Sequence, residues 1–180
     1  MKKNIIICCC LLGLSFAKAQ DTISVEKKLF KINLLLPGVV YEHGLDAKNT
    51  IYSELSTGIG YRSSSFLGKG WYFFPSIEEQ FRHYYNLEKR SLKNKNSNGN
   101  SGNYIGALAN YTFKSLTTNE NLGYYNPSFS LGAVWGFQRT YKHNFNINLN
   151  LGLGHVFEKD VKSNAVTPLI NFSLGWVIGK

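Results

Sequence analysis

The sequence predicts an all-β fold, an antiparallel transmembrane up-and-down β-barrel of about eight strands. Three observations support this: apolar and polar side chains alternate every two residues, most alternating segments are long enough to cross a bilayer, and an export signal precedes them. Successive side chains of a strand point to opposite faces, so the alternation indicates strands with one apolar and one polar face. A closed barrel lets such strands span lipid because it satisfies all backbone hydrogen bonds internally.

The segment 144–158 shows the alternation most clearly. Its apolar positions are Phe145, Ile147, Leu149, Leu151 and Leu153, and they alternate with Asn146, Asn148, Asn150, Gly152 and Gly154. The same pattern predicts further strands over 28–36, 39–45, 50–63, 71–86, 104–115, 124–141 and 167–179. Most of these segments reach the ~9–11 residues of a tilted membrane strand, whereas strands of soluble proteins are commonly ~5–6 residues long.

The strand count depends on the turn predicted at Pro37-Gly38. With this turn the count is eight, and an even number puts both termini on the periplasmic side, as in single-chain bacterial barrels. A single strand over 30–43 would instead give seven. Eight strands place the long connection 87–103 on the periplasmic side, where turns are normally short.

One predicted strand, 71–86, carries polar residues on its lipid-facing side. Strict alternation puts Glu79 and His83 on the outward face. Because charge at mid-bilayer is unfavourable, we expect either a bulge near Pro75 or a position at the membrane edge.

Residues 1–19 are predicted to be a cleaved secretory signal peptide, followed by a barrel domain over 20–180. The basic start Lys2-Lys3, the apolar run 5–14 and the small-x-small sequence 17–19 are typical of such signals. The run is too short for the alternative, a membrane anchor, which needs ~20 apolar residues. All three cysteines lie in it, so the mature chain has no disulfide or thiolate metal site.

The net charge of +9 falls by three, to +6, when Lys2, Lys3 and Lys18 are removed with the signal. Basic residues cluster in the polar segment 89–95, which we interpret as a solvated loop, with contact to anionic head groups or glycan as the alternative. An exported chain rarely meets nucleic acid, so none is expected as a partner. The expected partners are membrane lipids, including outer-leaflet glycolipid. We expect a monomer and leave a periplasmic or cell-surface partner open.

The interior of an eight-stranded barrel is just wide enough to be filled by side chains. The predicted interior charge network consists of Glu54, Arg62, Glu78, Gln80, Arg82 and Gln138. Opposite charges in such a space are expected to pair, because isolated buried charge is unfavourable. A plugged interior is therefore predicted, with a narrow polar channel as the alternative.

Aromatic residues near the predicted strand ends suggest two girdles at the level of the lipid head groups. The predicted interfacial set is Trp71, Tyr84, Tyr85, Tyr104, Tyr125, Tyr141 and Trp176. In a soluble protein the same residues would form part of the core.

No catalytic, cofactor-binding or metal-ligating residues are predicted, and the protein is not expected to be an enzyme. The four histidines, His43, His83, His143 and His155, are dispersed. A serine nucleophile needs a base within hydrogen-bond reach, and the sequence alone cannot place any serine beside a histidine. A lipid-modifying barrel enzyme with a His–Ser pair at its rim remains the alternative.

Three parts of the chain carry a resemblance to a known family. They are 31–42 (KINLLLPGVVYE), 81–90 with 100–104 (FRHYYNLEKR, NSGNY), and 136–138 with 151–154 (GFQ, LGLG). In these parts the chain resembles small outer-membrane β-barrel proteins of uncharacterised function from Bacteroidota. The resemblance implies a barrel and an outer-membrane location, with no catalytic residues or cofactor. It favours a structural, adhesive or surface-interaction role.

Overall fold

A computed structural model describes residues 23–158 and 166–180, so the predicted signal peptide lies outside the described residues. Within these residues the chain forms one antiparallel sheet of nine strands. The strands are β1 (Lys28–Asn33), β2 (Gly38–Gly44), β3 (Asn49–Ser64), β4 (Gly68–Tyr84), β5 (Asn103–Thr112), β6 (Leu116–Thr117), β7 (Ser128–Thr140), β8 (Phe145–Glu158) and β9 (Val166–Gly179). The short helix α2 (Leu87–Ser91) and the 3₁₀ turns η1 (Glu120–Leu122) and η2 (Lys142–Asn144) lie in the connections.

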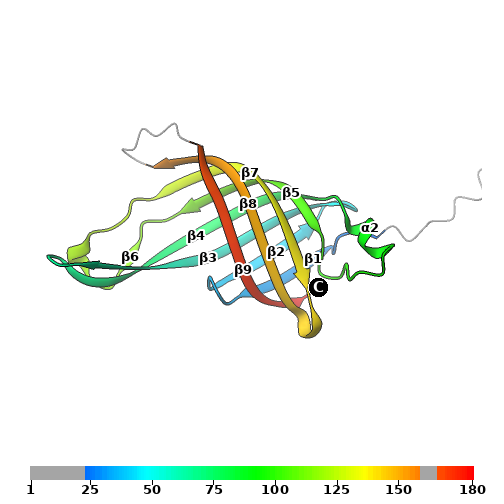
Figure 1. Cartoon of the computed structure of the whole chain (residues 1–180), viewed down its shortest axis with the longest axis horizontal. Helices are drawn as coiled ribbons and strands as arrows, with labels where there is room; N and C mark the ends of the chain where they lie inside the picture. Colours follow the sequence, from blue (N-terminus) through cyan, green and yellow to red (C-terminus); the bar gives the residue numbers. More distant parts are fainter. Residues whose placement is uncertain (1–22, 159–165) are drawn as a thin grey trace, which may run out of the picture.

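The sheet closes on itself, which confirms the predicted all-β barrel (Figure 1). β1 pairs with both β2 and β9, and β3 pairs with both β2 and β4. The ring then continues through β5, β7 and β8 back to β9. Eight strands form this ring, while the two-residue β6 pairs only with β4. The turn at Pro37-Gly38 does separate two short strands.

The barrel has two unlike ends. The terminal end carries residues 23–27, Lys180 and the connections 45–48, 85–102 and 141–144, and the hairpin end carries the turns 34–37 and 65–67 and the connection 113–127. β2 pairs with β3 only as far as Ser56, and β5 pairs with β4 only as far as Ser76, yet β3 and β4 stay paired up to Ser64 and Gly68. Beyond the ring, β3 and β4 therefore continue as an arm, which β6 flanks on the β4 side and which projects at the left of Figure 1.

The connection 113–127 is less regular than the predicted strands 104–115 and 124–141. The backbone N–H of Tyr125 donates to Ser115 Oγ (2.8 Å) instead of joining the sheet ladder. Gly123 has a positive φ of 73°, and Asn119 Oδ1 accepts from the backbone N–H of Asn121 (3.1 Å) to cap η1. These local hydrogen bonds compete with strand pairing, so β5 ends at Thr112 and β7 begins at Ser128.

The bulge considered near Pro75 is not present, because β3 and β4 pair without a register shift from end to end. The Pro75 carbonyl accepts from the N–H of Phe113 (2.9 Å), so it faces the β5 side. The carbonyl and nitrogen of one residue face the same neighbour in an antiparallel strand. The Pro75 nitrogen, which carries no hydrogen, therefore faces the β5 side just beyond Thr112. Thr112 is the last paired residue of β5, so no ladder hydrogen bond is required at Pro75.

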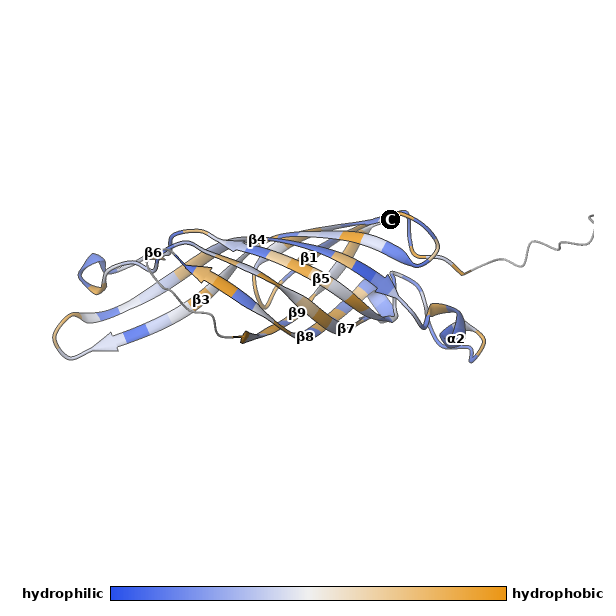
Figure 2. Cartoon of the chain, turned by 90° about the horizontal axis from the view of Figure 1, so that it is seen from above, coloured by the Kyte–Doolittle hydropathy of each residue, from blue (hydrophilic) through white to orange (hydrophobic). Residues whose placement is uncertain are grey.

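Apolar and polar bands alternate along the strands, as hydropathy colouring shows in Figure 2. In β8, Asn146, Asn148 and Asn150 are buried inside the ring, whereas Leu151 and Leu153 are exposed on its outer wall. This two-residue alternation gives the barrel a polar interior and an apolar exterior.

Candidate functional site

A buried charge network fills the barrel interior at the terminal end. Lys31 Nζ lies 3.3 Å from Glu42 Oε2, and both side chains are almost completely excluded from solvent. Glu42 Oε1 also accepts hydrogen bonds from Thr50 Oγ1 (2.9 Å) and Tyr84 OH (2.8 Å). Gln138 completes the cluster, since its Oε1 accepts from Lys31 Nζ (2.6 Å) and its Nε2 donates to Glu42 Oε2 (3.2 Å). The ion pair is therefore embedded in further hydrogen bonds, as a stable buried pair requires.

Arg82 is the largest fully buried side chain, and aromatic faces hold it. Its guanidinium carbon lies 3.4 Å from the ring centre of Tyr52 and 4.3 Å from that of Tyr104. Its Nε donates to Gln80 Oε1 (2.8 Å), and its Nη1 makes a longer contact with Gln138 Oε1 (3.4 Å). Cation–π contacts and amide oxygens thus replace a carboxylate partner for this charge.

The long connection 85–102 folds over the terminal end and closes it. Gln138 donates from Nε2 to the Gly99 carbonyl (2.9 Å) and from its backbone N–H to the Gly102 carbonyl (2.9 Å). Asn100, which is fully buried, accepts at Oδ1 from the backbone N–H of Glu26 (2.7 Å). The connection is long because it serves as a plug, which resolves its apparent conflict with an eight-stranded ring.

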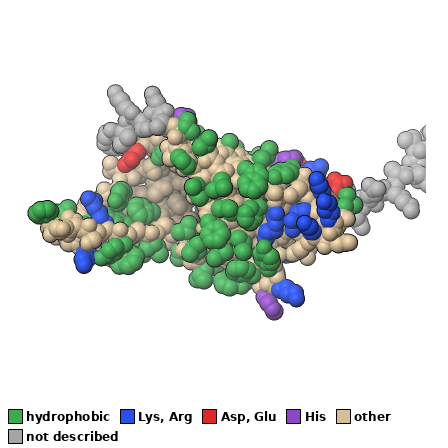
Figure 3. Space-filling model, viewed as in Figure 1, with side chains coloured by type: hydrophobic (Ala, Val, Ile, Leu, Met, Phe, Trp, Pro, Cys, Tyr) green, Lys and Arg blue, Asp and Glu red, His purple; other side chains and the backbone are tan. Residues whose placement is uncertain are grey.

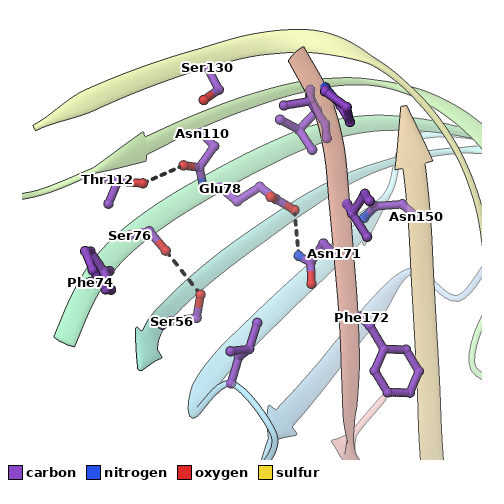
Figure 4. A pocket seen from close by; sticks show the side chains of 16 residues that line it. Ser56, Phe74, Ser76, Glu78, Asn110, Thr112, Ser130, Asn150, Asn171 and Phe172 are labelled. Carbon is purple, nitrogen blue, oxygen red and sulfur yellow. Dashed lines mark hydrogen bonds between the residues drawn. The ribbon is translucent and has the colours of Figure 1, made fainter. Parts of the chain in front are cut away.

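Toward the hairpin end the interior contains a cavity of about 360 Å³, lined about equally by polar and apolar residues. Figure 4 shows hydroxyl and amide side chains from β3, β4, β5 and β7 around it, with Glu78 and Asn171 joined by a hydrogen bond. The polar lining of these four strands includes Ser56, Ser76, Asn110, Thr112 and Ser130.

Five of the six residues of the predicted charge network face the interior and are buried: Glu54, Glu78, Gln80, Arg82 and Gln138. Arg62 is not brought to them. It lies exposed on the arm of β3 and β4, where β3 has run past the ring and no longer encloses an interior.

The predicted aromatic girdle divides in the same way. Five of its residues are exposed: Trp71, Tyr85, Tyr125, Tyr141 and Trp176. Tyr84 and Tyr104 instead point inward and are fully buried, so their assignment to the interface is corrected. They share the inward faces of β4 and β5 with Arg82 and Leu108, two and four residues away along the strands.

The outer wall is apolar on every strand of the ring. Figure 3 shows hydrophobic side chains over the middle of the wall, with Lys and Arg gathered toward the end that carries α2. Glu79 is an exception, since it lies on the outer face between Ile77 and Phe81 and accepts from Ser53 Oγ (2.7 Å). His83 also faces outward, near the terminal end of β4, within 2.8 Å of Asn49 Oδ1.

The histidine environments show no His–Ser hydrogen bond over 23–158 and 166–180. His43 Nδ1 lies 3.4 Å from Tyr41 OH, and His155 packs beside Phe157. Within the same ranges, no group of three or more His, Cys, Asp or Glu residues is arranged to hold a metal ion.

Glu42 and Asn100 are among the buried polar residues that sequence reasoning missed. The alternation of Val40, Glu42 and Gly44 could have assigned Glu42 to the inner face. No periodic signal marks Asn100, because it lies in a loop and is buried only by the closure of the barrel end.

No protein-family model, curated protein or solved structure matches this chain. No helix within the described part of the chain is long and apolar enough to cross a membrane.

Proposed function

We propose that this chain is an outer-membrane β-barrel with a structural, adhesive or surface-interaction role and no catalytic activity. The observation that carries the proposal is the apolar outer wall around a polar interior. Each ring strand exposes large apolar side chains outward, for example Ile32, Leu55, Phe81, Leu131 and Ile170. Soluble monomers rarely expose an apolar patch larger than a few hundred Å². A wall that surrounds the whole barrel is suited to lipid.

The interior favours a closed barrel over the channel that is its nearest rival. The Lys31–Glu42–Gln138 cluster and the 85–102 plug occupy the terminal end. The first described residues, 23–27, and the C-terminal Lys180 lie at this end, which would face the periplasm, and the arm of β3 and β4 would then extend outside the cell.

The test uses the refolded mature protein in detergent and in planar bilayers. The proposal expects a folded form that migrates faster on a gel before heating than after, and no discrete conductance steps. A protein that stays monomeric and folded without detergent would overturn the membrane assignment, and stepwise conductance would favour the channel. Turnover of outer-membrane lipid that is lost in His83→Ala or His155→Ala, with folding intact, would favour the enzyme.

A further inference from the structure

The cavity near the hairpin end contains a carboxylate with no cationic partner. Glu78 is buried at the cavity wall, and its hydrogen-bond donors are two neutral amides, Gln80 Nε2 (2.5 Å) and Asn171 Nδ2 (3.5 Å). Directly opposite it in the β3–β4 ladder lies Glu54, which accepts from Asn33 Nδ2 (2.8 Å) and Tyr52 OH (2.7 Å). In the described part of the chain, neither carboxylate lies within ion-pair distance of Lys, Arg or His.

The buried charges of the interior are unequal in number. Among the described residues the buried carboxylates are Glu42, Glu54 and Glu78, and the buried cations are Lys31 and Arg82. When all five are ionised, the interior carries one excess negative charge. Burial of an uncompensated charge is strongly unfavourable, so a cation in the cavity would relieve it.

Two further acceptors beside Glu78 are unused. Asn150 is completely buried, and neither atom of its amide has a hydrogen-bond partner, so its oxygen is free whichever way the amide is turned. Asn171 is its direct neighbour in the β8–β9 ladder, and the Oδ1 of Asn171 is also unpartnered. Glu78, Asn150 and Asn171 line one cavity from three strands, as Figure 4 shows.

We infer that this cavity binds a small hydroxylated primary amine through its ammonium group. An ammonium has three donors and no acceptor, which matches the three acceptors offered by Glu78, Asn150 and Asn171. The other hydroxyl and amide groups of the lining suit hydroxyls of the ligand, and the apolar lining residues, among them Phe74 and Phe172, suit its carbon skeleton. A volume of about 360 Å³ lies at the small end of ligand pockets, ~300–1,000 Å³, so the ligand has the size of a single sugar.

Isothermal titration calorimetry of the folded protein in detergent tests this inference, with glucosamine as the probe and glucose as its neutral counterpart. We expect glucosamine to bind at least about tenfold more tightly than glucose, since charge-assisted hydrogen bonds are about twice as strong as neutral ones. Glu78→Gln should weaken glucosamine binding by about tenfold or more. The matched control is Glu79→Gln, the same change one residue away on the outer wall, which should leave binding unchanged.

A second variant, Asn150→Leu, keeps the test independent of how Glu78→Gln folds, and it should also weaken glucosamine binding. Absence of glucosamine binding to the unaltered protein, equal binding of glucose, or unchanged binding in Glu78→Gln would overturn the inference. So would calcium chloride that binds in the cavity and displaces glucosamine. Heat-dependent gel migration verifies folding in each case. A folded barrel that fails to bind therefore refutes this inference alone and leaves the proposed membrane role untouched.

Discussion

Removal of the Glu42 charge should destabilise the barrel far more than removal of an exposed carboxylate. In Glu42→Gln the amide oxygen can replace Oε1, which accepts from Thr50 and Tyr84. The new amide nitrogen, however, replaces Oε2, which accepts from Lys31 Nζ (3.3 Å) and Gln138 Nε2 (3.2 Å). In the variant the new amide nitrogen would therefore face two other hydrogen-bond donors, and the buried ammonium of Lys31 would have no counter-charge.

The expected loss in the free energy of unfolding is about 3–5 kcal/mol, the range found when one partner of a buried ion pair is removed. The double variant Lys31→Met/Glu42→Gln removes the stranded ammonium as well. It also frees Gln138 Oε1, which accepted from Lys31 Nζ (2.6 Å), to accept from the new amide at position 42. We therefore expect the double variant to recover about 2–3 kcal/mol of the loss.

The assay is reversible urea unfolding of the refolded protein in lipid vesicles, followed by tryptophan fluorescence. The three tryptophans, Trp71, Trp135 and Trp176, all lie exposed on the outer face and report the change of environment. Glu79→Gln serves as the control for removal of a carboxylate. If Glu42→Gln loses less than about 1 kcal/mol, or if the double variant is as unstable as the single one, the ion pair is not the stabilising element described above.

Three further changes test other parts of the barrel by the same urea titration. Glu79→Leu should raise the free energy of unfolding by about 1–2 kcal/mol, because it removes a carboxylate from an apolar wall that would face lipid in the proposed membrane barrel. Gly136→Ala should lower the free energy of unfolding by about 2–3 kcal/mol, since the added methyl carbon would lie 2.5 Å from a buried tyrosine ring. The control is Gly58→Ala, where the nearest atom to the added carbon is 3.5 Å away. This control should change the free energy of unfolding by less than about 0.5 kcal/mol. Hydrogen bonds to the Asp46 carboxylate, first from the Asn49 side chain and then from nearby backbone N–H groups, hold its pKa below the usual value. This stabilisation is complete above the unfolded pKa of ~3.9 and is lost as the pH falls through the lower folded value, so Asp46→Ala should show a smaller acid-induced loss of stability than the unaltered protein.

The two faces of the sheet were predictable because alternation is a local property of the backbone. Because side chains alternate between the two faces of a strand, Asn146, Asn148 and Asn150 could be assigned to the interior before any pairing was known. Tyr84 and Tyr104 were misassigned where residue type was given more weight than this alternation. Tyr84 lies two residues from Arg82 and Tyr104 lies four residues from Leu108, so strict alternation would have placed both rings on the inward face.

The contacts inside the barrel could not be predicted, because ring closure brings together residues that are distant in sequence. Lys31 and Gln138 are 107 residues apart and come from strands on different parts of the ring. Arg62 illustrates the opposite effect. Its side chain lies on the face of β3 that points inward within the ring, but β2 ends before it reaches Arg62, so this side chain is not enclosed. Strand length relative to its neighbours, which alternation does not encode, decides whether such a residue is enclosed.

The division of the interior into two charge environments makes stability and ligand binding separable. At the terminal end Lys31 and Arg82 accompany Glu42 under the plug. Glu54 and Glu78 instead face each other in the β3–β4 ladder, with Glu78 at the cavity wall, and neither lies within ion-pair distance of a cation in the described part of the chain. Like charges directly opposite in a ladder are destabilising, so neutralising Glu78 should relieve repulsion even as it removes an acceptor for the ligand. Substitutions at the terminal end should therefore weaken the fold and spare binding in the molecules that remain folded. Substitution of Glu78 should weaken binding in a barrel that is at least as stable as before, a combination that a purely structural role for this carboxylate would not produce.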